Sequence, residues 1–183
     1  SFGAAIAIVC GLHARAAFAT RVVVLDDGER IARDIDRPLP PSPWNRAIDL
    51  FALRGETIAL QIVIEASDDV NGVHALVGSL ARDDGERLDA RVDLFAERFI
   101  EIARPSGSAR GPGSLAFTAK AAPGITGWVA DALVPFDLAG DLRVAKETRG
   151  AIWIDLTVPQ DARPGAYRSA ILVRDDDGEI SVR

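Results

Sequence analysis

The sequence has few of the residues from which metal and redox centres are built. Its 183 residues include one cysteine, two histidines and no methionine. A single cysteine cannot form a disulfide within the chain, and a metal site built from histidine and cysteine needs more ligands than remain here. We therefore expect no disulfide, no metal and no cofactor.

Basic charge is also scarce. The chain carries 21 Lys and Arg against 27 Asp and Glu, a net charge of −6. Without a basic stripe to contact phosphates, neither a nucleic acid nor an anionic membrane surface is an expected partner. The sequence also contains no phosphate-binding loop, no nucleophile elbow and no dinucleotide fingerprint, since the glycine-containing run 107–113 does not match G-x-G-x-x-G.

The first nineteen residues differ from the rest of the chain. Residues 4–12 are an apolar run, and residues 17–19 (Ala-Phe-Ala) form a small-x-small pattern before Thr20. This pattern predicts the back half of a secretory signal peptide over 1–19 and an exported protein, periplasmic or extracellular, whose domain spans 20–183. The alternative is a buried N-terminal strand or helix; the run is too short to span a bilayer as a helix. Because methionine is absent, we expect the chain to be part of a longer product.

Short strand patterns separated by turn signals fill most of the remaining sequence. Residues 56–66 alternate well, and further strands are predicted at 21–25, 73–80 and 91–102, the last with a bulge near Phe95. The tetrapeptide Asp-Asp-Gly-Glu begins at positions 26, 83 and 176 and predicts tight turns, not metal loops.

Residues 151–173 give the clearest fold signal. Ile152, Ile154, Leu156 and Val158 share one strand face, and a second alternating run follows a turn containing Pro159, Pro164 and Gly165. We interpret this region as a hairpin. With the other strand patterns it predicts an all-β fold, an antiparallel β-sandwich that is immunoglobulin-like or jelly-roll-like.

Two stretches are predicted to be loops. Residues 36–45 hold four prolines and should be extended. Residues 104–127 form one long loop rich in glycine and proline, and loops of this length are usually functional or contact another domain.

No catalytic constellation is evident. The acidic residues are spread over alternating strand faces and turns, where charges are usually solvated, so we expect no catalytic pair; this holds for Asp93, Glu97, Glu101, Asp131, Asp137 and Asp155. The only histidine after the leader, His74, lies in a strand pattern and should be structural or exposed.

The candidate substrate-binding residues are Trp44, Trp128 and Asp131. An exposed tryptophan in a loop can stack on a sugar ring, and Trp44 follows the proline run while Trp128 ends the long loop. The alternative for both is packing in the core or between domains. A third tryptophan, Trp153, falls opposite the Ile/Leu face and could lie at a sheet edge or against a neighbouring domain.

An ordered set of short motifs resembles one family. The set comprises 52–56 (Ala-Leu-Arg-Gly-Glu) with Gln61, then 92–101, 105–106 (Pro-Ser), Trp128 with 131–135, 153–155, 158–159 and 164–168. It is similar to the N-terminal β-sandwich of secreted glycoside hydrolase family 123 enzymes and of the domain-of-unknown-function 4091 group, over residues 44–183.

The resemblance implies a sandwich followed by a larger (β/α)-barrel in the same polypeptide. In the characterised enzymes of that family the barrel carries the catalytic acids and removes N-acetylgalactosamine with the substrate's own acetamido group as nucleophile. No position of this chain inherits those roles, so the chain alone is expected to be non-catalytic and its parent an N-acetylhexosaminidase-like hydrolase. Two alternatives remain, a stand-alone carbohydrate-binding or adhesion module and a structural spacer.

Overall fold

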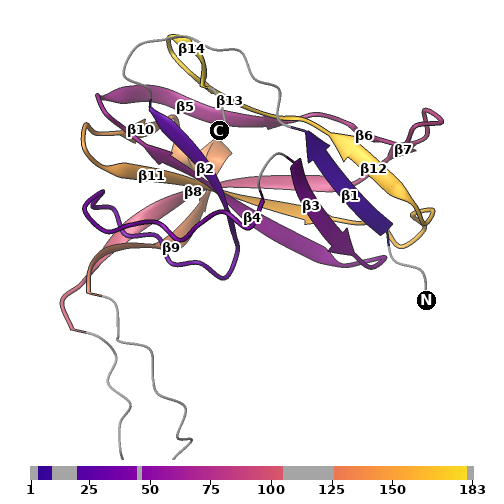
Figure 1. The fold of residues 1–183 in the computed structure, drawn as a ribbon, viewed down its shortest axis with the longest axis horizontal. Coiled ribbons are helices and arrows are strands. Elements are labelled where there is room, and N and C mark those ends of the chain that lie inside the picture. Colours follow the sequence, from indigo (N-terminus) through magenta and orange to yellow (C-terminus); the bar gives the residue numbers. More distant parts are fainter. Residues whose placement is uncertain (1–3, 10–19, 45–46, 105–125, 181–183) are drawn as a thin grey trace, which may run out of the picture.

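The computed structural model describes residues 4–9, 20–44, 47–104 and 126–180, with the backbone alone for 4–9. The regular elements among these residues are strands, apart from one turn of helix, α1 (Phe136–Ala139). Figure 1 shows the strands stacked in two layers, which confirms the predicted all-β sandwich. The loop predicted at 104–127 lies mostly outside the described residues.

The first layer is a five-stranded antiparallel sheet whose order places β11 at its centre. In spatial order its strands are β2 (Arg21–Asp26), β4 (Thr57–Glu65), β11 (Arg149–Thr157), β8 (Arg91–Ile102) and β9 (Gly127–Pro135). β11 pairs with β4 on one side and with β8 on the other over most of its length.

The second layer consists of two smaller sheets. One has the order β3 (Ala47–Ala52), β1 (Ala4–Val9), β12 (Ala166–Ser169), β6 (Leu80–Ala81) and β7 (Arg87–Leu88). The other has the order β10 (Leu142–Val144), β5 (Val70–Val77), β13 (Ile171–Asp175) and β14 (Gly178–Ile180). Only Ala170 separates β12 from β13, so the chain passes directly from one sheet to the other.

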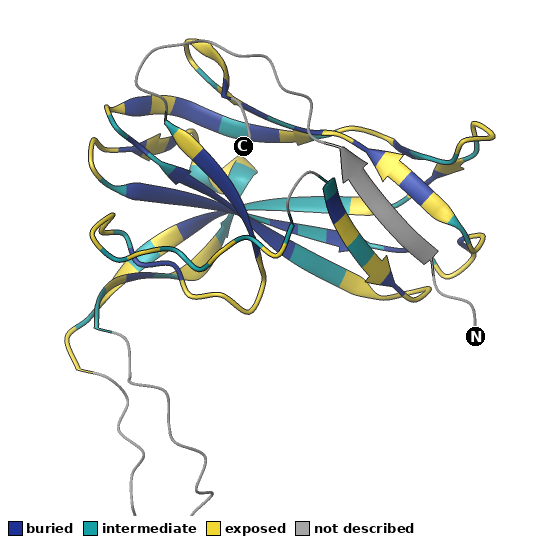
Figure 2. Cartoon of the chain, in the orientation of Figure 1, coloured by how far each residue is buried: buried dark blue, intermediate teal, exposed yellow. Residues whose placement is uncertain are grey.

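The main core lies between the two layers, because alternate residues of each strand point inward. From the first layer it receives Ile62, Ile64 and Ile152, and from the second Val73 and Val173, all fully buried. The shared face predicted for Ile152, Ile154, Leu156 and Val158 is therefore confirmed as the buried one, and Figure 2 shows this buried centre.

A second, smaller core covers part of the outer face of the first layer. Val23, Leu25, Val63 and Ala151 point away from the main core and pack with Ile31. The segment 31–39 crosses this outer face, and its backbone is joined to the sheet by an isolated bridge between Ala32 and Val129. Part of the outer face is thereby buried as well as the inner face.

The predicted hairpin at 151–173 is wrong. β11 pairs only with strands of the first layer among the described residues, whereas β12 pairs with β1 and β6 of the second layer. The connection between them crosses from one layer to the other, and its Val158 and Ala162 are buried in the main core. Alternation identified the buried faces of both strands correctly. It does not show that the strands lie in different layers, because both layers bury residues in the same core.

The predicted bulge near Phe95 is also wrong. β8 is one strand of twelve residues, and its register with β11 is regular through Phe95. The irregularity lies between Arg98 and Phe99, whose partners on β9 are Ala132 and Ala130. Asp131 is thus the extra residue, so the bulge belongs to β9.

All three Asp-Asp-Gly-Glu sequences form turns, as predicted. The second joins β6 to β7 and the third joins β13 to β14 as hairpins. The first follows β2 without returning the chain to a paired strand, since β2 pairs with β4.

The segment predicted to be a leader contributes a strand. β1 (Ala4–Val9) is antiparallel to β3 and parallel to β12. This arrangement corresponds to the alternative of an N-terminal strand, and the signal peptide over 1–19 stays a prediction. In the part of the chain that the structure describes, no helix has the length and apolar character needed to cross a bilayer.

Candidate functional site

Trp44 is packed as a structural residue. Its half-buried ring lies against the main core, and its indole N–H donates to the carbonyl oxygen of Asp49 at 3.1 Å. This is the packing alternative considered for Trp44, and the indole retains only part of its surface for a ligand.

Trp128 is more accessible and is held in place from one side. Its side chain is 36% exposed, and the guanidinium of Arg33 lies 4.5 Å from the centroid of its ring. The backbone N–H of Arg33 also donates to the carbonyl oxygen of Trp128 at 2.9 Å. A cation–π contact of this kind fixes the ring plane, and the remaining ring surface is open to an apolar ligand face.

Asp131 lies on the same strand as Trp128 and is exposed at the bulge of β9. A bulge redirects a side chain relative to its neighbours, so Asp131 is presented outside the regular alternation. Among the described contacts none joins Trp44 to Trp128 or Asp131. The structure therefore groups two of the three predicted residues on one strand and places the third beside β3.

Sequence reasoning missed a polar cluster centred on Arg149. Arg149, at the start of β11, is buried, and its Nε and one terminal nitrogen donate to Oε1 of Glu65 at 2.8 and 2.6 Å. Its two terminal nitrogens also donate to four backbone carbonyls of the segment 31–39, those of Ala32, Asp34, Ile35 and Arg37. We call this arrangement the Arg149 clamp.

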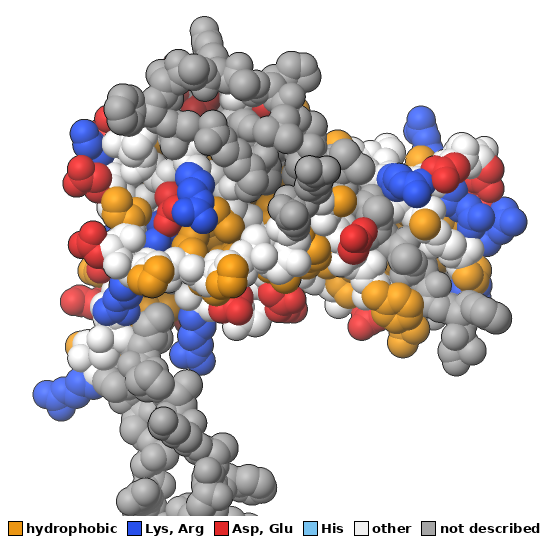
Figure 3. Space-filling view, viewed as in Figure 1, with side chains coloured by type: hydrophobic (Ala, Val, Ile, Leu, Met, Phe, Trp, Pro, Cys, Tyr) orange, Lys and Arg blue, Asp and Glu red, His pale blue; other side chains and the backbone are white. Residues whose placement is uncertain are grey.

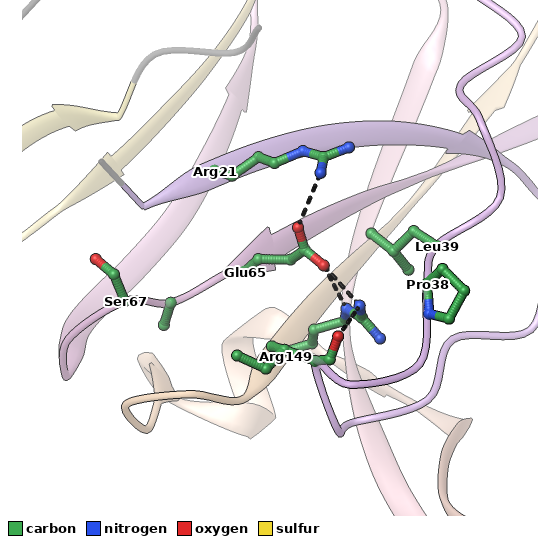
Figure 4. A pocket seen from close by; sticks show the side chains of 8 residues that line it. Arg21, Pro38, Leu39, Glu65, Ser67 and Arg149 are labelled. Atoms are coloured by element: carbon green, nitrogen blue, oxygen red, sulfur yellow. Dashed lines mark hydrogen bonds and ion pairs between the residues drawn. The ribbon is translucent and has the colours of Figure 1, made fainter. Parts of the chain in front are cut away.

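A recess of about 440 Å³ lies beside the Arg149 clamp (Figure 4). Arg21 approaches Oε2 of Glu65 to 3.4 Å from one side, and Pro38 and Leu39 form an apolar wall on the other. A guanidinium has five N–H donors, and those of Arg149 are all engaged. Arg149 is thus a structural residue, and the polar side chains that line the recess beside it include Glu65, Arg21 and Ser67.

For Glu97 of β8 the predicted solvated position is wrong, because its partners on the neighbouring strands bury it. Its side chain is on the outer face of the first layer, the residue is 4% exposed, and its Oε1 has no hydrogen-bond partner in the described chain. Burial raises the pKa of the Glu97 carboxyl from 4.5 to about 7. Glu97 is therefore a neutral acid over most of the acidic range.

Two other carboxylates face each other on the same side of this sheet. Asp93 of β8 is the direct partner of Asp155 of β11. Nε of Arg91 lies 2.7 Å from Asp93, and the indole N–H of Trp153 donates to Asp155 at 2.6 Å. Trp153 is on the central strand, which excludes the sheet edge, one of the two positions considered for it.

The remaining groups do not assemble into a metal centre or a catalytic centre in the described ranges. No cluster of three or more His, Cys, Asp or Glu residues suited to a metal ion is found there. His74 lies in β5, as predicted, and its Nδ1 is 2.9 Å from the carbonyl oxygen of Gly72. On the surface turned to the viewer in Figure 3, acidic and basic side chains are interspersed.

The fold and these sites define a β-sandwich module in which the buried Arg149 joins a strand to a loop through its hydrogen bonds. Comparison with protein-family models matches residues 37–175 to the glycoside hydrolase 123 N-terminal domain. The chain belongs to this family, which confirms the resemblance seen in the sequence.

A similar solved structure is that of a family 123 glycoside hydrolase from Clostridium perfringens, reported in a study of glycolipid glycan hydrolysis. The sequence identity is 21% and the TM-score is 0.44. The match covers 72% of this chain and 20% of that chain, so this chain spans about a fifth of the length of the enzyme. A search of curated proteins gives no match.

Proposed function

We propose that this chain is the non-catalytic N-terminal β-sandwich of an exported glycoside hydrolase-like protein, where it supports a catalytic (β/α)-barrel in the same polypeptide. The observation that carries the proposal is the family match to an N-terminal domain over residues 37–175. The parent would be an N-acetylhexosaminidase-like enzyme, and the barrel would hold its catalytic acids.

The roles of the acidic residues support a non-catalytic module. Glycoside hydrolysis requires two carboxyl groups on either side of the scissile bond. Here Glu65 is bound to Arg149, and Asp93 and Asp155 are bound to Arg91 and Trp153 on the face of one sheet. These three carboxylates are therefore each engaged in a contact within the sandwich.

The test is an activity comparison between the full polypeptide and residues 20–183. We expect the full polypeptide to cleave aryl N-acetylhexosaminides and the sandwich alone to give no turnover. Turnover by the sandwich alone would contradict the assignment, and so would a full polypeptide that contains no second folded domain.

A contribution to glycan binding is the second part of the proposal. It is supported by Trp128, whose ring is partly exposed and fixed by Arg33, and by the nearby Asp131 on the same strand. Trp128→Ala should weaken the binding of an N-acetylhexosamine oligosaccharide, measured by calorimetric titration, about tenfold, since ring stacking contributes roughly 1–3 kcal/mol. Trp44→Phe is the matched control, because Trp44 packs against the core. Unchanged binding by the Trp128 variant would exclude this aromatic platform.

A further inference from the structure

One cross-strand row runs straight across the outer face of the first layer. In order from β9 to β2, the paired residues are Pro135, Phe95, Trp153, Gln61 and Leu25. Direct partners in antiparallel strands place their side chains on the same side of the sheet and close together. The row therefore forms a continuous strip that is apolar except for one amide.

The two ends of this strip differ in how they are covered. Leu25 and Gln61 are buried, and Gln61 donates to the carbonyl oxygens of Asp26 and Glu29, which close over it. Phe95, Trp153 and Pro135 remain partly exposed at the other end. The outer face of a sandwich sheet is usually polar, so two adjacent aromatic rings there are unusual for a face that meets only water.

Carboxylates border the exposed end. Asp93 and Asp155 are direct partners one rung beyond the aromatic pair, and like charges placed directly opposite destabilise a sheet. Each has one partner, Arg91 for Asp93 and the indole N–H of Trp153 for Asp155, and each carboxylate can accept further hydrogen bonds. An incoming cation between them would relieve the repulsion.

Leu133 extends the exposed end toward the edge of the sheet. It is the partner of Glu97 on β9, it is on the same outer side, and 40% of its surface is exposed. We call the surface formed by Asp93, Phe95, Leu133, Pro135, Trp153 and Asp155 the Trp153 face. Its composition, aromatic and aliphatic in the centre and acidic at one border, is typical of a protein–protein contact.

We propose that the Trp153 face docks the domain that follows the sandwich in the same polypeptide, and that this domain presents an Arg or Lys side chain to Asp93 and Asp155. The inference rests on the proposed function, which supplies such a domain. The acidic border determines the charge of the partner surface, and the aromatic pair supplies the apolar area that the contact buries.

A neighbouring domain fits the Trp153 face better than a glycan does. The indole N–H of Trp153, which would otherwise contact a sugar hydroxyl, is already donated to Asp155 at 2.6 Å. Trp153 and Phe95 are partly buried among their strand neighbours, which leaves them less ring area for stacking than a projecting loop tryptophan has. An apolar surface with an acidic border is instead suited to a complementary protein surface.

The test is side-chain footprinting by hydroxyl radicals. A protease site is introduced after Arg183 of the full polypeptide, and the intact polypeptide is compared with the sandwich that remains after cleavage and removal of the second domain. Phe95, Leu133 and Trp153 should react about threefold more slowly in the intact polypeptide, because docking removes most of their accessible surface. Leu76, which is 48% exposed on β5 of the other layer, is the internal control and should not change.

Charge reversal provides a second measurement on the full polypeptide. Asp93→Lys and Asp155→Lys should each raise the reactivity of Trp153 to that of the cleaved sandwich and should separate one thermal transition into two. Asp141→Lys removes the same charge from an exposed position before β10 and should leave both readouts as in the unmodified polypeptide.

Three outcomes would overturn the proposal. Equal reactivity of Trp153 before and after cleavage means that no domain covers this face; if the intact polypeptide still cleaves its substrate, the proposed function stands and the docking surface alone is wrong. Protection of Trp153 in the cleaved sandwich by an N-acetylhexosamine oligosaccharide would make the face a glycan platform. Retention of docking by both charge-reversal variants would exclude the cationic contact.

Discussion

At the scale of single residues, the buried carboxyl of Glu97 links the stability of the domain to pH. Its pKa is about 7 in the folded chain and 4.5 in the reference state, so the folded state binds the additional proton between these two values. The contribution of Glu97 to the free energy of unfolding is then highest below pH 4.5, falls as the pH rises, and is lowest above pH 7.

We expect Glu97→Gln to remove this pH dependence. The shift corresponds to roughly 3 kcal/mol, so the variant should be more stable than the unmodified chain by about 1–3 kcal/mol at pH 8 and equal to it near pH 4. Denaturant unfolding at both pH values measures the difference. Glu101→Gln, at an exposed position of the same strand, is the control and should change stability at neither pH.

The Arg149 clamp predicts a large effect of a conservative substitution. Arg149→Lys keeps the charge but provides three donors in place of five, so Glu65 and the carbonyls of the segment 31–39 lose partners. We expect a loss of about 2–4 kcal/mol in the free energy of unfolding, measured in urea.

Arg21→Lys is the control for the clamp, since Arg21 contacts the same carboxylate at 3.4 Å with a largely exposed side chain. It should cost less than about 1 kcal/mol, as exposed ion pairs do. Equal losses for both variants would mean that the saturated hydrogen bonding of Arg149 contributes nothing beyond its charge.

These residues show the limit of sequence reasoning. Neither Arg149 nor Glu97 stands out in the sequence, because their roles depend on carbonyls and strands more than thirty positions away. The tryptophans do stand out by type, but type alone did not separate Trp44, which packs on the core, from Trp128, which is fixed by Arg33.

At the scale of elements, a glycine decides how closely two strands approach. Gly150 lies on the inner side of β11 beneath β10, and a methyl group in place of its hydrogen would come within 2.4 Å of Cγ2 of Val144. Gly150→Ala should therefore reduce stability by about 1–3 kcal/mol, as overpacking of a core does.

The matched test of this crowding is the double variant Gly150→Ala/Val144→Ala. Removing the methyl groups of Val144 makes room for the new one, so the combined loss in thermal unfolding experiments should be clearly smaller than the sum of the two single losses. Strict additivity would show that Val144 is not what the added methyl group meets.

Alternation predicted the elements themselves well and their pairing less well. β2, β4, β8 and β11 all lie where the patterns placed them. A period of two identifies the buried face of a strand, but it does not say which strand is hydrogen-bonded beside it, so the crossing between β11 and β12 looked like a hairpin. The bulge was assigned to the wrong strand. The change of phase was read in the sequence of β8, but the extra residue, Asp131, belongs to its partner strand β9.

At the scale of the whole molecule, the N-terminal residues decide how the second layer is completed. β1 lies between β3 and β12, whereas a leader over 1–19 would be removed on export. We expect the exported protein to begin at Thr20, which N-terminal sequencing by mass spectrometry of the secreted product would establish. A mature N-terminus before Ala4 would instead make β1 a permanent strand of the sandwich.

The Arg149 clamp has a consequence for how this protein can change over evolutionary time. Its hydrogen bonds to the segment 31–39 all end on main-chain carbonyl oxygens, at positions 32, 34, 35 and 37. Asp34 and Ile35 direct exposed side chains to solvent while their backbones are held. Substitutions at these positions therefore leave the hydrogen bonds to Arg149 in place. Related proteins can present different side chains on the segment 31–39 while its backbone keeps the same path.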